Sequence, residues 1–122
     1  MAALTHNIRP FRADDRHWAF DLAAGLGLSP WTEDDYLLEI GHEDSLMLIA
    51  EIGTQRLGFI IGRCVPRSVA GGGLDAEIYN IGVEPELQRS GIGSRLIEHF
   101  LNGCRVKGVK EVWPSCHMLR YQ

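Results

Sequence analysis

The segment from Gln88 to Ser94, QRSGIGS, combines residue types that could bind an anion. It stands between an apolar run that ends at Val83 and a stretch with helical apolar spacing. Free N–H groups at the start of a helix attract anions, and the helix dipole adds to this attraction. Gly91 and Gly93 carry no Cβ that would hold a phosphate away from the backbone, and Arg89 adds a positive charge. The pattern predicts a phosphate or pyrophosphate cradle; in the plainer interpretation, the glycines only permit a tight turn and close helix packing.

Two familiar phosphate-binding loops do not fit this segment. A Walker loop requires Gly-Lys followed by Ser or Thr, and the sequence contains no Gly-Lys pair. A dinucleotide-binding loop requires a third glycine where Leu96 stands, and its first glycine follows the strand almost directly. Here residues 84–90 intervene, so the dinucleotide interpretation is disfavoured.

Composition limits the class of protein. A chain of 122 residues suits a single domain, here 1–122, and 45% hydrophobic with 23% charged residues is typical of a globular protein. The net charge of −4 argues against a nucleic-acid partner. The sequence has neither a signal-peptide layout nor an apolar run long enough to span a bilayer. We therefore expect a cytoplasmic protein with no nucleic-acid or membrane partner.

The cysteine pattern is irregular. Cys64, Cys104 and Cys116 are odd in number and unevenly spaced. Such spacing favours neither a disulfide framework nor a metal site. We expect three reduced thiols and no metal.

The sequence predicts a mixed α+β fold in the order β-α-α-β-β-β-α-β. Strands are expected at 7–11, 45–52, 57–65, 75–83 and 110–113, with a turn at 53–56. Helices are expected after a cap at Asp14 or Asp15, over 32–41 with a capping box of Thr32 and Asp35, and from about Gly93 until Gly108. Only the last β-α-β unit is expected to be parallel, with a right-handed crossover.

The motif around the predicted cradle resembles the acetyl-CoA-binding motif of the GNAT superfamily of N-acetyltransferases. That motif is a strand, then V-x-P-x-x-Q/R-x-x-G-x-G/A, then a helix; here it stands as Val83, Pro85, Gln88, Gly91 and Gly93. The element order also matches, so the resemblance covers about residues 8–113. It implies a GNAT-like fold, amides that bind the CoA pyrophosphate and strand backbone that pairs with the pantetheine arm. The cofactor-binding residues that it implies are Ile81, Gly82, Val83, Gln88, Arg89, Ser90, Gly91, Ile92, Gly93 and Ser94.

Glu77 is the candidate general base. Acetyl transfer to an amine requires removal of the ammonium proton, which a nearby carboxylate can accept. The stretch AEIYNIGV, with Glu77 eleven residues before Gln88, resembles the histone acetyltransferase branch, where the glutamate on this strand is the base. The alternative is a solvent-facing strand residue. Tyr79 and Asn80 are interpreted as packing or ladder residues.

A second resemblance concerns the acceptor. Residues 30–36 are similar to the acceptor-side helix of ribosomal-protein alanine N-acetyltransferases. With Glu39, Glu43 and Asp44 they form an acidic segment that could receive a cationic amine. A solvated helix face is an equally good interpretation.

The final residues depart from the family pattern. Ser115 stands where the alanine acetyltransferases carry a glutamate, and their acid tyrosine would fall beyond Gln122. The divergent tail 114–122 indicates a truncated or frameshifted chain, or a sheet completed by a partner subunit in a homodimer. The leading hypothesis is an acetyl-CoA-dependent N-acetyltransferase acting on a primary amine, with a protein N-terminal α-amine favoured. The alternative is a CoA-binding domain with little or no catalysis.

Overall fold

The computed structural model describes residues 6–28, 30–66 and 74–106. Four strands form an antiparallel sheet in the order β1-β2-β3-β4. Their bounds are Asn7–Pro10, Ser45–Ile52, Gln55–Pro66 and Leu74–Val83. The expected α+β class is confirmed, and β1 lies at one edge of the described sheet. The strand expected at 110–113, its parallel unit and the tail 114–122 lie outside the described residues.

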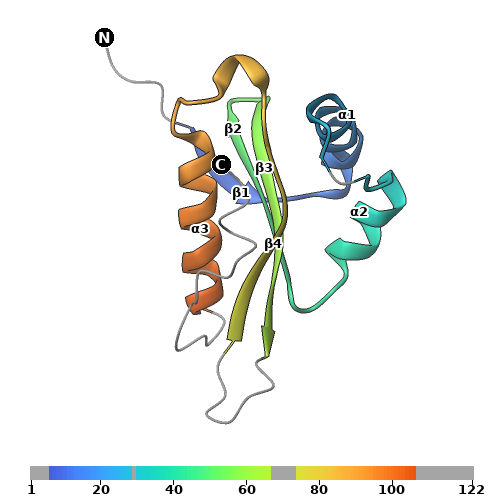
Figure 1. The fold of residues 1–122 in the computed structure, drawn as a ribbon, viewed down its shortest axis with the longest axis vertical. Coiled ribbons are helices and arrows are strands. Elements are labelled where there is room, and N and C mark those ends of the chain that lie inside the picture. The colour runs from blue at the N-terminus through green and yellow to red at the C-terminus, as the bar shows by residue number, and fades with distance from the viewer. Residues whose placement is uncertain (1–5, 29, 67–73, 107–122) are drawn as a thin grey trace.

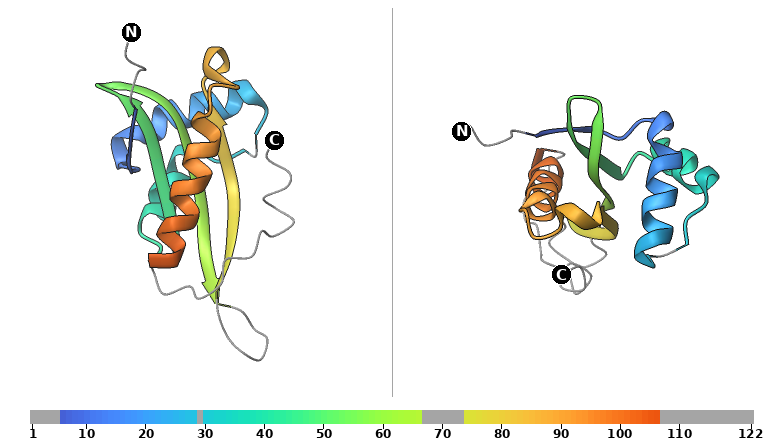
Figure 2. Two further views of the ribbon diagram at one scale, coloured as in Figure 1. Left: turned by 90° about the vertical axis from the view of Figure 1, so that its left-hand side faces the viewer. Right: turned by 90° about the horizontal axis from the view of Figure 1, so that it is seen from above.

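The helices form a layer on each face of the sheet. α3 (Ile92–Val106) packs on one face, while α1 (Arg16–Leu26) and α2 (Glu33–Ile40) cover the other, as Figures 1 and 2 show. Short 3-10 turns, η1 (Ala13–Asp15) and η2 (Pro85–Leu87), precede α1 and α3. In these described ranges, no helix has the length and apolar character that crossing a membrane would require.

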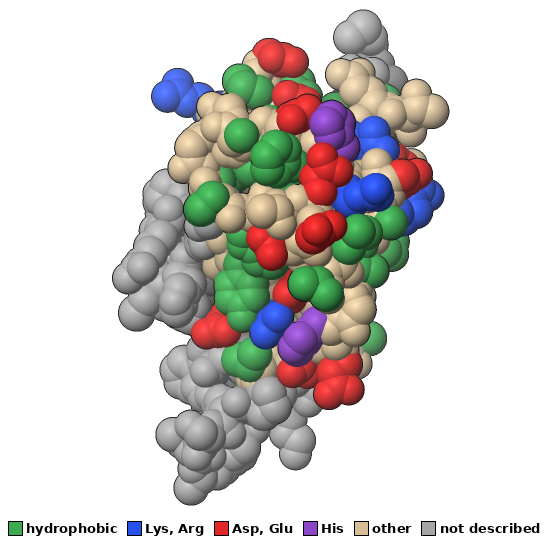
Figure 3. Space-filling model, turned by 90° about the vertical axis from the view of Figure 1, so that its right-hand side faces the viewer, with side chains coloured by type: hydrophobic (Ala, Val, Ile, Leu, Met, Phe, Trp, Pro, Cys, Tyr) green, Lys and Arg blue, Asp and Glu red, His purple; other side chains and the backbone are tan. Residues whose placement is uncertain are grey.

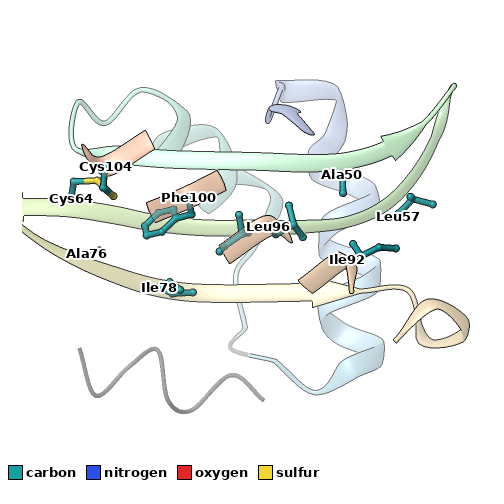
Figure 4. Close-up of a cluster of buried hydrophobic side chains, with 10 residues drawn as sticks. Ala50, Leu57, Cys64, Ala76, Ile78, Ile92, Leu96, Phe100 and Cys104 are labelled. Atoms are coloured by element: carbon teal, nitrogen blue, oxygen red, sulfur yellow. A yellow bond between two sulfur atoms is a disulfide. The ribbon is translucent and has the colours of Figure 1, made fainter. Parts of the chain in front are cut away.

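Each layer encloses a hydrophobic core. On the α3 side, Leu96, Phe100 and Cys104 recur every four residues and are fully buried against β3 and β4 (Figure 4). This spacing confirms the amphipathic stripe expected from the sequence. On the other side, α1 and α2 pack on Phe59, Ile61 and the rest of a second cluster, in which Met47 is also buried.

The hairpin between β2 and β3 has a tighter turn than the sequence predicts. Ile52 pairs with Gln55, so only Gly53 and Thr54 form the turn. Gly53 has φ 58°, which a glycine adopts without strain. Arg56, expected in the turn, therefore belongs to β3 and points its guanidinium back toward η1, where its Nε donates to Asp15 Oδ1 at 2.6 Å.

Asp15 does not cap α1 with its side chain, although it occupies the cap position. Its carboxylate is fully buried and accepts hydrogen bonds from Arg9, Arg56 and the Arg12 amide. Burial alone would raise the pKa of Asp15, but these donors outweigh it and lower the pKa to about 2. The residue thus joins β1, β3 and the start of α1 rather than serving the helix locally.

The expectation of reduced thiols is wrong for two of the three cysteines. Cys64 of β3 and Cys104 of α3 form a disulfide, with Cα atoms 5.8 Å apart (Figure 4). Both side chains lie in the α3-side core. Sequence spacing could not reveal the pair because the partners are 40 residues apart and meet only when α3 packs on the sheet. Cys116 lies outside the described residues.

Candidate active site

A cleft of about 890 Å³ lies beside the end of β4 and the start of α3. One wall is formed by Ile81 and Val83 of β4 with the segment leading into α3. Leu26, the last residue of α1, and Leu28 just after it also line the cleft. The hydrogen bond from Trp18 Nε1 to Glu84 Oε2, 3.0 Å long, ties α1 to the end of β4 next to this cleft.

The chain enters α3 through two left-handed residues. Arg89 has φ 70° and Gly91 has φ 92°. At Gly91 a side chain would be strained, which explains one glycine of the motif. The Arg95 amide donates to the Gly91 carbonyl at 3.0 Å, in the first turn of the helix. The first amides of a helix have no intrahelical acceptor, so those of residues 92–94, beside the cleft, can bind an anion.

Arg89 is exposed beside this helix start. Within the three described ranges it forms no ion pair, so its charge is available to an anion in the cleft. The Gln88 side chain instead has a structural contact, because its Nε2 donates to the Val83 carbonyl at 3.3 Å. Ser90 likewise donates its hydroxyl to the Leu87 carbonyl.

Seven of the ten predicted cofactor-binding residues line the cleft: Ile81, Val83, Gln88, Arg89, Gly91, Gly93 and Ser94. The other three do not. The Ile92 side chain is buried in the α3-side core, and a Cβ on Gly82 would meet the Phe59 ring at 2.8 Å on the opposite face. Sequence reasoning missed the apolar lining, namely Leu26, Leu28, Leu87 and Ile97. The helical spacing of apolar residues after Gly93 could have indicated Ile97 as a lining residue. No pattern in the neighbouring sequence connects residues 26–28 to this site.

Glu77 lies where β4 is bulged. Ile61 pairs with Asn80 but Gly62 pairs with Ile78, so Tyr79 is the extra residue of the bulge. Tyr79 contacts Trp31 of the α1–α2 layer, with ring centroids 6.4 Å apart, and its hydroxyl donates to Glu77 Oε1 at 3.3 Å. Glu77 and Tyr79 are thus half-buried neighbours on the α1–α2 face of the sheet.

The family follows from the sequence match. Residues 11–119 match the Acetyltransferase (GNAT) family. The chain belongs to the GNAT family. The resemblance seen in the motif is thereby confirmed.

Curated GNAT relatives match a shorter segment. The [ribosomal protein bS18]-alanine N-acetyltransferases of Salmonella typhimurium and Escherichia coli K12 are each 38% identical over 39 residues. That segment is 32% of this chain and 26% of each relative. The match therefore spans about a quarter of the length of the curated relatives.

Solved GNAT structures share the fold over most of the described chain. The E. coli ribosomal-protein-S18-alanine N-acetyltransferase superposes with TM-score 0.69 at 24% identity, over 89% of this chain and 65% of that one. Ard1 from Thermoplasma volcanium superposes with a TM-score of 0.70 at 24% identity, over 88% of this chain and 68% of that one. An aminoglycoside acetyltransferase from an uncultured soil metagenomic sample superposes with a TM-score of 0.72 at 18% identity, over 88% of this chain and 75% of that one.

The prediction that an acidic segment of this GNAT chain could receive a cationic amine is wrong for Glu39. Glu39 is buried, not solvated, and both its oxygens accept from Arg63, at 2.7 and 2.8 Å. The hydrogen bonds from Arg63 lower the pKa of Glu39. Glu39 is therefore already neutralised by a protein cation and is not free to bind an amine. Other acidic side chains are exposed across the α1–α2 face, as Figure 3 shows.

Proposed function

We propose that this GNAT chain transfers the acetyl group of acetyl-CoA to a primary amine, and that a protein N-terminal α-amine is the favoured acceptor. The observation that carries the proposal is the cleft in which left-handed Gly91, the first turn of α3 and the exposed Arg89 meet the end of β4. The α-amine is favoured because the curated relatives are named as ribosomal-protein alanine N-acetyltransferases.

The residues divide the work between the two faces of β4. The amides at 91–94 and the Arg89 guanidinium bind the pyrophosphate, and the backbone of Ile81 and Val83 pairs with the pantetheine arm. In the described sheet β4 is an edge strand, so its backbone groups that do not pair with β3 can bind this arm, and the arm would share the Val83 carbonyl with Gln88 Nε2 or displace it. Glu77 takes the proton of the ammonium, directly or through a water. The amine nitrogen then bonds to the thioester carbonyl carbon, the C–S bond breaks, and CoA leaves as thiolate to be protonated.

The first experiment measures ligand binding. Titration with CoA or acetyl-CoA should raise the melting temperature, because ligand at about 100 times Kd stabilises the native state by about 2.7 kcal/mol. Arg89→Glu should weaken this response strongly. Arg105→Glu is the matched control, since Arg105 is an exposed arginine in the last turn of the same helix. A flat response of the wild-type protein would overturn the proposal.

The second experiment measures transfer. Release of CoA thiol is followed with acetyl-CoA and a peptide that begins with alanine, with a small primary amine for comparison. Glu77→Gln should lose most of the turnover, since a positioned base contributes about 100-fold or more, and should keep its CoA-induced melting shift. A melting shift with no thiol release from any amine would instead support the alternative, a CoA-binding domain without catalysis.

A cytoplasmic location and a homodimer are also part of this proposal. A ribosomal acceptor would require the protein to be in the cytoplasm, where disulfides are uncommon. Cell fractionation together with a free-thiol count tests the location. Sedimentation of the purified chain tests the homodimer.

A further inference from the structure

A continuous set of contacts leads from α2 to the candidate base. Glu39 of α2 binds the Arg63 guanidinium through both carboxylate oxygens. Arg63 lies over the Tyr79 ring, with its guanidinium carbon 5.6 Å from the ring centroid. The Tyr79 hydroxyl in turn donates to Glu77. The set thus ends on the one carboxylate to which a catalytic role has been assigned.

The Tyr79 ring is held from more than one side. The bidentate bond to buried Glu39 leaves the Arg63 guanidinium little freedom, and a cation over an aromatic face is attractive. Trp31 contacts the same ring from the α1–α2 layer. A ring held in this way keeps its hydroxyl in one place, so the hydrogen bond to Glu77 has a defined direction.

The hydroxyl is also kept protonated. Burial raises the pKa of Tyr79, and the negative charge of Glu77 raises it further. Tyr79 therefore remains a hydrogen-bond donor at any pH near neutrality.

We propose that Tyr79 is a positioning residue, whose hydroxyl fixes one oxygen of Glu77 so that the other faces the acceptor amine. The proposal rests on the proposed function, because Glu77 must act as the base. Tyr79 touches neither acetyl-CoA nor amine in this role and exchanges no proton with them. Arg63 and Glu39 support it by holding the ring.

The test compares two identical substitutions in one aromatic cluster. Tyr79→Phe removes the hydroxyl but keeps the ring that contacts Arg63 and Trp31. Tyr36→Phe is the matched control. Tyr36 is fully buried, and its ring centroid lies 5.4 Å from that of Trp31. Among the described residues its hydroxyl has no hydrogen-bond partner. Acetyl transfer by the full chain to an alanine-initiated peptide is measured for both variants, the wild type and Glu77→Gln.

At pH 7, Tyr79→Phe should lower kcat about 10-fold, part of the roughly 100-fold or more that a positioned base contributes. Its KM for acetyl-CoA should equal that of the wild type, and Tyr36→Phe should retain kcat. At about pH 9.5 an α-amine, with a pKa of about 8, is already neutral and needs no base. The losses in Tyr79→Phe and Glu77→Gln should then shrink together.

The outcomes separate the inference from the function on which it rests. If Tyr79→Phe behaves like Tyr36→Phe in an active protein, the positioning role is refuted while acetyl transfer stands. A loss in Tyr79→Phe that persists at high pH, when the loss in Glu77→Gln has vanished, would show that Tyr79 acts independently of the base. A wild-type protein that transfers no acetyl group to any amine would refute both.

Discussion

The disulfide between Cys64 and Cys104 should contribute a large part of the stability of this chain. It closes a loop with a sequence separation of 40 residues, which spans β4 and most of α3. In the chain-entropy treatment, a loop of this length lowers the entropy of the unfolded state by an amount worth about 4 kcal/mol at 25 °C. For a chain of 122 residues this corresponds to a fall of roughly 15 °C in melting temperature on reduction.

The assay is urea unfolding of oxidised and reduced protein. The oxidised sample, unfolded without reductant, should titrate as a single free thiol, that of Cys116, and the reduced sample as three. Cys116→Ser is the matched control, since it removes a thiol and leaves the Cys64–Cys104 bond in place. Equal unfolding midpoints with and without reductant, or three free thiols in the oxidised sample, would refute the reasoning.

Two further predictions concern the groups that hold the elements together. The pKa of Asp15 is about 2 in the folded state and 3.8 without the fold, so its carboxylate stabilises the native state above about pH 4. The free energy of unfolding should fall by about 2 kcal/mol as the pH is lowered from about 4 to 2. Asp15→Asn should abolish most of this dependence in acid unfolding curves and leave less stable protein at pH 7. Gly62→Ala should cost about 1–3 kcal/mol, because its Cβ would collide with the Glu77 carbonyl oxygen and lie 2.5 Å from the Phe100 ring. Gly25→Ala, with no atom within 4 Å of the added Cβ, should be neutral or stabilising in the same unfolding assay.

Elements defined by neighbouring residues were predictable from the sequence. β2 covers 45–52 as expected, and the capping box forms, with the Thr32 amide donating to Asp35 and the Asp35 amide to Thr32. Both depend on contacts within a few residues, so local patterning determines them. The cradle motif likewise placed one wall of the cleft, because its residues are adjacent in the chain.

Features that depend on distant partners were not predictable. Glu39 on a short acidic helix has the pattern of a solvated residue, and only the position of Arg63 on β3 explains its burial. Leu26 and Leu28 reach the cleft because α1 is tied to the far end of β4, through a bond between residues 66 positions apart. A single sequence carries no local trace of such pairings.

The bulge at Tyr79 is the feature that lets one strand form two different surfaces. Side chains alternate along a strand, so without a bulge Glu77, Tyr79, Ile81 and Val83 would share one face. With Tyr79 as the extra residue, the alternation shifts by one position. Before the bulge, Ile78 packs in the α3-side core while Tyr79 faces Trp31; after it, Ile81 and Val83 pack on the α3 side and line the cleft.

This shift in alternation explains how the candidate base and the candidate cofactor site can serve one reaction. Glu77 lies on the α1–α2 face, where exposed acidic side chains could attract a cationic amine. The cleft lies at the start of α3, where an anionic coenzyme is favoured. The two charges are opposite, and the sheet separates their binding surfaces. Because β4 is the edge strand of the described sheet, the two surfaces adjoin along this strand, and the proposed reaction would take place beside it, between Glu77 and Val83.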